Sequence, residues 1–94
     1  MSRLVTIVIP FYNEQDNLSV LLTEVVKTMK GLAEIDWQVL LVNDGSSDDS
    51  RRVVEELQSQ YSNLLYLEFS RNFGKEAALS AGLHQAEGDA VITM

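Results

Sequence analysis

The sequence predicts an α/β fold in which a parallel sheet lies between helices. Two observations support this fold class. Apolar runs rich in β-branched residues alternate with amphipathic segments, as strand and helix three times and then a fourth strand. The runs are nearly continuous in apolar character, which is typical of parallel strands covered on both faces. With 94 residues, the chain has the length of about one small domain, and we expect a Rossmann-like three-layer sandwich.

The first strand is expected at residues 4–9, "LVTIVI", and a helix at residues 15–30. In that helix, apolar side chains fall on a single stripe. They are Leu18, Leu21, Leu22, Val25, Val26 and Met29. Asn13 is the expected N-cap of the helix, and Gly31 suits its C-terminal end.

A second strand is expected at residues 37–43, followed by "DGSSDDS", a turn that leads into another helix. Ser46 with Asp49 three residues later fits a capping box at the start of that helix. The buried side of the helix is expected to consist of apolar and aromatic residues. These are Val53, Val54, Leu57 and Tyr61.

The third strand is expected at residues 63–69 and a third helix at residues 75–86. Gly82 lies among alanines in this helix, which indicates a close approach between helix and sheet. Asp89 is expected in the turn that precedes a fourth strand at residues 90–94.

Composition excludes several classes of function. The net charge of −7 argues against nucleic-acid binding, which requires a basic face, and provides no polybasic patch for a membrane surface. The absence of cysteine excludes disulfides and thiolate metal sites, as is usual for a cytoplasmic protein. The N-terminal apolar stretch is short and is broken by Pro10, so a signal peptide is not expected.

Polar side chains at the ends of the first two strands predict a ligand site, because open α/β sheets bind ligands beyond the carboxyl ends of their strands. Asp44 can accept hydrogen bonds from the ring N–H of a pyrimidine or guanine, or from ribose. The alternative for Asp44 is an Asx turn or a helix cap. Tyr12 offers a flat face for stacking, and Pro10 fixes the chain direction. Glu14 suits a base or ribose, or the positive end of a helix dipole, and together these residues predict a nucleoside site.

Other nucleotide and phosphate sites do not fit the first turn. "PFYNEQ" contains no glycine, which excludes a dinucleotide fingerprint and the Gly-rich loop of a sugar nucleotidyltransferase. The chain has no P-loop motif. Receiver and phosphatase folds place an acid where this chain has Pro10.

"PFYNE" followed later by "VNDGSSDDS" resembles the beginning of the family 2 glycosyltransferases, which have the GT-A fold. "SRNFGKEAALSAGL" and "GDAVITM" resemble the polyprenyl-phosphate branch of that family. This branch includes dolichyl-phosphate mannose synthase and the undecaprenyl-phosphate glucosyl- and aminoarabinosyl-transferases. The resemblance covers essentially the whole chain.

The resemblance implies a set of nucleotide-sugar contacts. They fall on Pro10, Tyr12, Glu14, the backbone of Val42, and Asp44 at the base. Arg71 and Lys75 are weaker candidates for a phosphate or an acceptor loop, and solvated surface positions are the alternative for both. His84, the only histidine, is expected to be structural.

The implied activity is transfer of a sugar from a UDP- or GDP-linked donor to a polyprenyl phosphate, for cell-envelope glycan or lipid modification, at the cytoplasmic face of a membrane. The family uses a divalent cation, Mg²⁺ or Mn²⁺, bound by an Asp-x-Asp motif after the fourth strand. Because residues 1–94 end at Met94, where this motif is expected to begin, we expect an N-terminal part that carries the nucleotide site, with no catalytic or metal-binding residue. The alternative is a non-catalytic nucleoside-binding or oligomerising module. An open edge at the fourth strand predicts self-association.

Overall fold

The computed structural model describes residues 3–31, 35–85 and 90–93. Within them the strands form a parallel sheet in the order β3-β2-β1-β4. The strands are β1 (Arg3–Phe11), β2 (Ile35–Asn43), β3 (Leu64–Glu68) and β4 (Ala90–Thr93). The helices are α1 (Leu18–Lys30), α2 (Ser50–Gln60) and α3 (Lys75–Gln85). The predicted alternation of strand and helix is confirmed.

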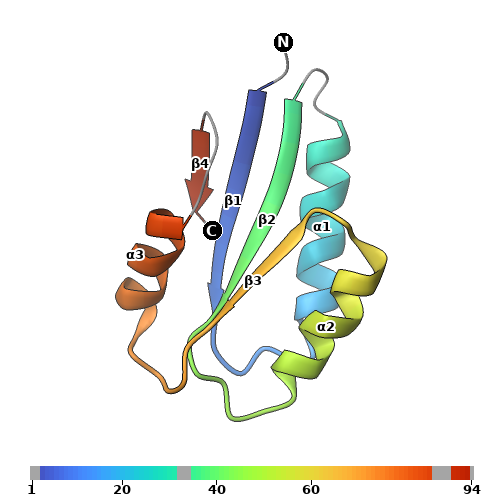
Figure 1. The fold of residues 1–94 in the computed structure, drawn as a ribbon. Helices are drawn as coiled ribbons and strands as arrows, with labels where there is room; N and C mark the ends of the chain where they lie inside the picture. The colour runs from blue at the N-terminus through green and yellow to red at the C-terminus, as the bar shows by residue number, and fades with distance from the viewer. Residues whose placement is uncertain (1–2, 32–34, 86–89, 94) are drawn as a thin grey trace.

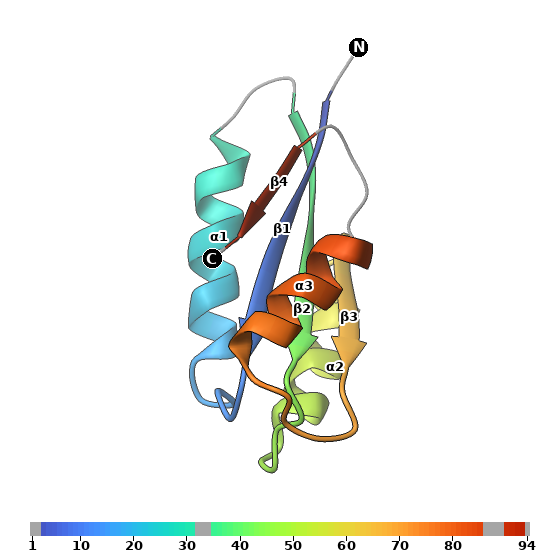
Figure 2. The same ribbon diagram turned by 90° about the vertical axis from the view of Figure 1, so that its left-hand side faces the viewer.

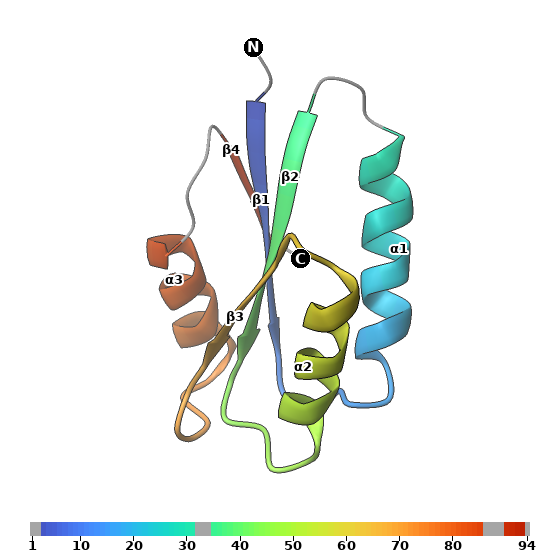
Figure 3. The ribbon, with the colours of Figure 1, turned by 45° about the vertical axis from the view of Figure 1, so that its right-hand side comes forward.

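The helices cover both faces of the sheet. Helices α1 and α2 lie side by side on one face and α3 lies on the other (Figures 1 and 3). The larger apolar cluster joins α1 and α2 to the sheet, and it includes Ile7, Leu22 and Leu41. A smaller cluster on the α3 side contains Val8, Leu40, Val42 and Ala78. The predicted three-layer arrangement is therefore present.

The order of the strands reverses at β1. The chain moves outward from β1 to β2 and β3, and then returns so that β4 lies on the other side of β1 (Figure 2). Strand β4 pairs residues 90–93 with residues 5–8 of β1, so the last part of β1 extends past this pairing. The carboxyl end of β1 is therefore a topological switch point, where open α/β sheets bind ligands.

Gly82 brings α3 close to the sheet, as the sequence predicts. A Cβ atom at this position would overlap Cγ1 of Val8 and lie 3.1 Å from Cγ2 of Val42. Gly82 and Ala78 are the buried residues of α3. Small residues on this side of the helix therefore set the spacing between α3 and strands β1 and β2.

Helix α1 begins three residues later than expected, and the prediction that Asn13 is its N-cap is wrong. The backbone oxygen of Glu14 accepts hydrogen bonds from the N–H groups of Asn17 and Leu18, at 2.9 and 3.0 Å, so a tight turn precedes the helix. Asn17 is the N-cap residue and makes no side-chain cap. Asn13 lies outside the helix with φ of 53°, in the left-handed region.

The predicted capping box of the second helix is also wrong. Asp49 precedes α2 without a side-chain cap, and the Ser46 hydroxyl oxygen instead accepts the N–H of Asn13 at 2.9 Å. The carboxylate of Asp48 accepts the N–H of Ser50 at 3.0 Å and so satisfies the first turn. Strand β2 begins at Ile35, two residues before the predicted start. The expected positions of Ala86, Asp89 and Met94 lie outside the described residues.

Candidate functional site

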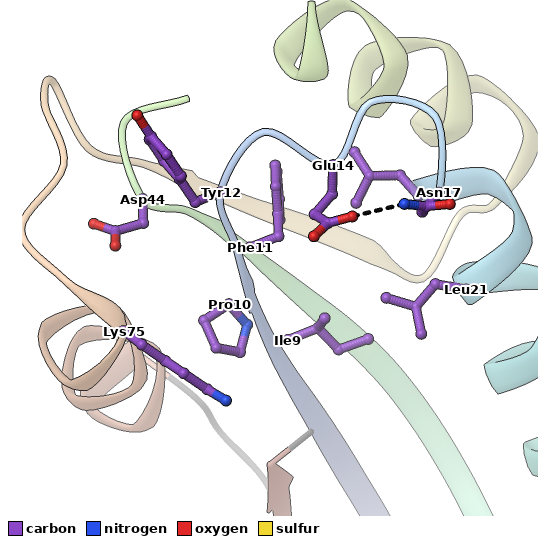
Figure 4. Close-up of a pocket in the computed structure, with 10 residues that line it drawn as sticks. Ile9, Pro10, Phe11, Tyr12, Glu14, Asn17, Leu21, Asp44 and Lys75 are labelled. Atoms are coloured by element: carbon purple, nitrogen blue, oxygen red, sulfur yellow. Dashed lines mark hydrogen bonds between the residues drawn. The ribbon is translucent and has the colours of Figure 1, made fainter. Parts of the chain in front are cut away.

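A pocket of about 520 Å³ lies at the carboxyl end of β1, between the starts of α1 and α3 (Figure 4). Five of the predicted site residues line it: Pro10, Tyr12, Glu14, Asp44 and Lys75. Apolar side chains, including Ile9, Phe11 and Leu21, form much of the remaining wall. Mostly apolar walls with a few placed polar groups are typical of small-molecule sites.

The other two predicted residues do not line this pocket. Val42 is fully buried in the cluster on the α3 side, paired with Pro10 in the sheet. The guanidinium carbon of Arg71 lies 4.7 Å from the centre of the exposed Phe73 ring. His84 lies in α3, beside a second, more open hollow that Leu67 and Phe69 also line.

The first loop presents an aromatic ring and a carboxylate to the pocket. Tyr12 is 46% exposed, so its ring is accessible to a planar ligand. The carboxylate of Glu14 accepts a hydrogen bond from the side-chain amide of Asn17 at 2.8 Å (Figure 4). Lys75, at the start of α3, supplies the positive charge of the pocket lining.

Asp44 is buried, and its carboxylate holds the loop that precedes α3. Its Oδ1 accepts the N–H of Phe73 at 2.8 Å, and its Oδ2 accepts the N–H of Gly74 at 3.0 Å. The side-chain amide of Asn72 donates to Oδ2 and to the backbone oxygen of Asp44, at 3.1 Å in each case. The predicted alternative for Asp44 was an Asx turn or a helix cap. The carboxylate does accept backbone N–H groups, but the donors, Phe73 and Gly74, lie 29 and 30 positions later in the chain.

A set of hydrogen bonds, here called the two-loop clasp (Asn13, Gln15, Ser46, Ser47 and Asp48), joins the loop after β1 to the loop after β2. The Asn13 Oδ1 accepts the N–H groups of Ser47 and Asp48, at 2.8 and 3.3 Å. The N–H of Gln15 donates to Asp48 Oδ2 at 3.2 Å. The clasp fixes Tyr12 and Asp44 relative to each other. The sequence signal that was overlooked is Asn in a turn, since Asn is enriched at positive φ.

The second loop is supported from β3 through Asn43. The Asn43 Oδ1 accepts the N–H of Ser46, and its Nδ2 donates to the Tyr66 hydroxyl, both at 2.8 Å. Tyr66 in turn donates to Glu68 Oε1 at 2.6 Å. Burial, together with this bond to Glu68, raises the pKa of Tyr66 to about 12. Tyr66 therefore remains a hydrogen-bond donor at neutral pH.

Asp48 belongs to the clasp in its charged form. Burial by itself raises the pKa of its carboxyl group. The hydrogen bonds from the side chain and backbone of Ser50, and from the backbone of Gln15, outweigh burial and hold the pKa below the ordinary 3.8. The acceptor that the clasp needs is thus present at neutral pH.

The described residues do not form a divalent-cation site. Over residues 3–31, 35–85 and 90–93, no three His, Asp or Glu side chains gather as a metal ion requires. The carboxylates of Glu14 and Asp44 already accept hydrogen bonds from protein donors. In the same residues, no helix has the length and apolar character needed to cross a bilayer.

Comparison with known families identifies the class of protein. The model of glycosyl transferase family 2 matches residues 6–94, and the chain belongs to this family. The undecaprenyl-phosphate 4-deoxy-4-formamido-L-arabinose transferase of Proteus mirabilis (strain HI4320) is 42% identical over 91 residues. The match covers 96% of this chain and 28% of that protein, so the chain spans about a quarter of the length of this relative.

Solved structures show the same fold. A mannosyltransferase of Pyrobaculum calidifontis, in complex with GDP-Man and Mn²⁺, matches with a TM-score of 0.75 and 24% identity, over 97% of this chain and 26% of that one. TarS of S. aureus, in complex with UDP, matches with a TM-score of 0.78 and 24% identity, over 100% of this chain and 27% of that one. The described residues therefore have the architecture of the first part of a GT-A fold.

Proposed function

We propose that the whole protein transfers a sugar from a UDP- or GDP-linked donor to a polyprenyl phosphate, and that residues 1–94 supply the nucleotide-sugar-binding part. Membership of family 2 and the similarity to an undecaprenyl-phosphate transferase support this proposal. The observation that carries it is the pocket at the switch point, which brings Tyr12, Glu14, Asp44 and Lys75 together.

Each pocket residue has a role that its surroundings allow. The exposed face of Tyr12 stacks on the base, and Asp44 accepts a ring N–H of that base. Glu14 accepts from ribose hydroxyls, and Pro10 shapes the wall beside them. Lys75 offers its ammonium group to the diphosphate. This positive charge favours binding of an anionic donor even though the chain has a net charge of −7.

In the proposed reaction, an oxygen of the acceptor phosphate attacks the anomeric carbon of the sugar. A bond forms between that oxygen and the carbon, and the bond from the carbon to the nucleoside diphosphate breaks. The nucleoside diphosphate leaves with the electron pair. This chain binds and orients the nucleoside, and we expect the 94-residue chain by itself to be inactive.

A divalent cation, Mg²⁺ or Mn²⁺, is proposed for the whole protein. The Pyrobaculum calidifontis mannosyltransferase, which shares the fold, was solved with Mn²⁺. The described residues of this chain provide no ligand set for the ion, so none of the roles given above passes through it. Since the proposed acceptor is a membrane lipid and nucleotide sugars are cytoplasmic metabolites, we place the reaction at the cytoplasmic face of a membrane.

Donor kinetics in the whole protein test the proposal. Tyr12→Ala removes the stacking face and should weaken donor binding about tenfold, with Glu14→Gln weakening it less. Leu65→Ala, at an exposed position on β3, and Glu24→Gln, on the exposed side of α1, are the matched controls. Unchanged donor affinity in both pocket variants would remove the proposed site. Nucleotide binding without sugar transfer would favour the non-catalytic module instead.

We also propose that the 94-residue chain self-associates. Strand β4 lies at one edge of the described sheet, and Leu65, Phe73 and Leu83 are exposed apolar side chains. Sedimentation velocity over a range of concentrations measures this directly, and a single monomeric species at the highest concentration would contradict it.

A further inference from the structure

Asn43 is buried at the carboxyl end of β2, where its side chain joins β3 to the loop after β2. It is 2% exposed, and in the sheet it is paired with Phe11 on one side and with Glu68 on the other. Its Oδ1 accepts the N–H of Ser46, and its Nδ2 donates to the Tyr66 hydroxyl, both at 2.8 Å. Because a backbone N–H only donates, the amide must present its oxygen to Ser46 and its nitrogen to Tyr66.

The orientation of this amide is decided by β3. The Tyr66 hydroxyl gives its proton to Glu68 Oε1 at 2.6 Å, so it offers a lone pair to Asn43. The pKa of Tyr66, about 12, keeps this proton in place at neutral pH. The same Oε1 also lies 3.5 Å from Asn43 Nδ2. A flipped amide would turn its oxygen towards acceptors on β3 and its nitrogen towards a donor, so β3 holds it in one orientation.

On its other side, the amide is connected to the first loop through Ser46. The hydroxyl oxygen of Ser46 accepts the N–H of Asn13 at 2.9 Å. Asn13 lies between Tyr12 and Glu14 in the chain, and both of these line the pocket. One continuous series of hydrogen bonds therefore runs from the edge of the sheet to the pocket, through Glu68, Tyr66, Asn43, Ser46 and Asn13.

In the part of the chain that the structure describes, the residues lining the pocket come from β1, α1, the start of α3 and the loops after β1 and β2, and β3 supplies none. Asn43 does not line the pocket either. We propose that Asn43 is a positioning residue for this pocket, and that Tyr66 and Glu68 of β3 act through it on the affinity for the nucleotide donor. The inference rests on the proposed function, which gives β3 no role.

The first test changes the amide. Calorimetric titration of the whole protein with UDP and with GDP identifies the nucleotide that binds more tightly, and that nucleotide is then used for every variant. Asn43→Leu leaves the N–H of Ser46 without this acceptor and should weaken binding about tenfold. Asn43→Asp keeps the acceptor, and the Tyr66 hydroxyl can turn its proton to the new carboxylate. This variant should bind within about twofold of the unmodified protein.

A control for lost stability is Val54→Ala. Val54 is fully buried in the larger apolar cluster and makes no part of the series of bonds. The change should lower the melting temperature and leave nucleotide affinity unchanged at temperatures where the protein is folded. In donor kinetics, Asn43→Leu should raise KM with kcat within about twofold, because the series ends at side chains that hold the nucleoside. An equal loss of affinity in Val54→Ala would overturn the positioning role.

The second test changes β3 at a distance from the pocket. Tyr66→Phe removes the main acceptor of Asn43 Nδ2 and should weaken nucleotide binding about three- to tenfold. Tyr61→Phe is the matched control, because Tyr61 packs against the same apolar cluster but follows the end of α2. Its affinity should not change. Unchanged affinity in Tyr66→Phe would overturn the role given to β3.

Ser46→Ala keeps the test decisive if Asn43→Leu does not fold. It removes the hydroxyl oxygen that accepts the N–H of Asn13 and should weaken binding about three- to tenfold. Ser59→Ala, whose hydroxyl bonds within α2 to the backbone oxygen of Glu56, should have no effect. Unchanged affinity in Ser46→Ala, with weaker binding in Tyr12→Ala, would overturn the inference and leave the proposed function in place. Failure of the unmodified protein to bind either nucleotide would overturn both.

Discussion

The side-chain oxygen of Asn13 accepts the backbone N–H of Ser47 at 2.8 Å, across 34 positions of sequence. The backbone of Asn13 has φ of 53°, which turns its side chain towards the second loop while its own N–H donates to Ser46. Tyr12 and Glu14 are its neighbours in the chain and both line the pocket. A contact between loops thus fixes the positions of two side chains that line the pocket.

Replacing Asn13 should destabilise the protein in a graded manner. Asn13→Ala loses an acceptor for two N–H groups and adds backbone strain, so we expect a loss of about 2–4 kcal/mol in unfolding free energy. Asn13→Gly keeps the positive φ and should lose less, and Asn13→Asp keeps the acceptor and should be the most stable of the three. Urea denaturation with an unchanged m-value measures each loss.

The matched control for these variants is Asn17→Ala. Among the described residues, the side chain of Asn17 donates one hydrogen bond, to the exposed carboxylate of Glu14, and its loss should cost less than about 1 kcal/mol. If Asn13→Gly were as stable as the unmodified protein, the side chain of Asn13 would contribute nothing to folding.

Gly45 and Gly74 allow steric overlap to be separated from backbone strain. Both have positive φ, +70° and +100°, but a Cβ on Gly45 overlaps the backbone of Arg71 and Asn72, while a Cβ on Gly74 has nothing within 4 Å. Gly74→Ala should therefore cost only the strain, about 1–2 kcal/mol. Gly45→Ala should cost clearly more. Thermal denaturation compares the two, and equal melting temperatures would show that the loop is not packed on Gly45.

The close approach of α3 to the sheet predicts coupling between Gly82 and Val8. Gly82→Ala should destabilise the protein, because the new methyl group overlaps Val8 Cγ1, part of a side chain that is fully buried. Val8→Ala opens space at the same point. The free energy of unfolding lost in the double variant should therefore be smaller than the sum of the losses in the two single variants. A double-mutant cycle should give a coupling energy of about 0.5–3 kcal/mol. Additive losses would contradict this packing.

Tyr66 predicts a dependence of stability on alkaline pH. Its pKa in the folded protein, about 12, lies above the ordinary 10.0, so the folded state retains the proton more strongly than the unfolded state. The resulting stability is present in full below pH 10 and is lost as the pH rises through 12. Tyr66→Phe should remove the decrease in unfolding free energy that Tyr66 causes between pH 10 and 12.

A second variant separates the contribution of Glu68 from that of burial. Glu68→Gln replaces the charged acceptor of the Tyr66 hydroxyl with a neutral one, so the pKa of Tyr66 should fall towards 10.0. Ultraviolet titration of the phenolate follows this change. No change in the titration of Tyr66 would contradict the role given to Glu68.

The fold could be predicted because each element carries its own local pattern. The apolar stripe of α1 buries Leu18, Leu22 and Met29 as the helical period requires, and β2 ends in five consecutive buried positions. The position of Gly82 among alanines predicted the close contact between α3 and the sheet. These features depend on residues that are near one another in the sequence, which is why periodicity and composition reveal them.

The site was predicted only in part, because its bonds join segments that are distant in the sequence. Pro10, Tyr12, Glu14, Asp44 and Lys75 do line one pocket. The donors to Asp44 come from positions 28–30 residues later, and no local pattern encodes that pairing. Asn13 and Ser46 were assigned to local helix caps for the same reason, although each bonds to the other loop.

The contact at Gly82 also limits how the molecule can respond when a ligand arrives. Helix α3 cannot slide or roll on β1 without driving its backbone into Val8, so the helix serves as a fixed support. Any displacement that begins at Asp44 is then confined to the short segment in front of the helix. That segment is itself tied to Asp44, because the N–H groups of Phe73 and Gly74 donate to the carboxylate at 2.8 and 3.0 Å.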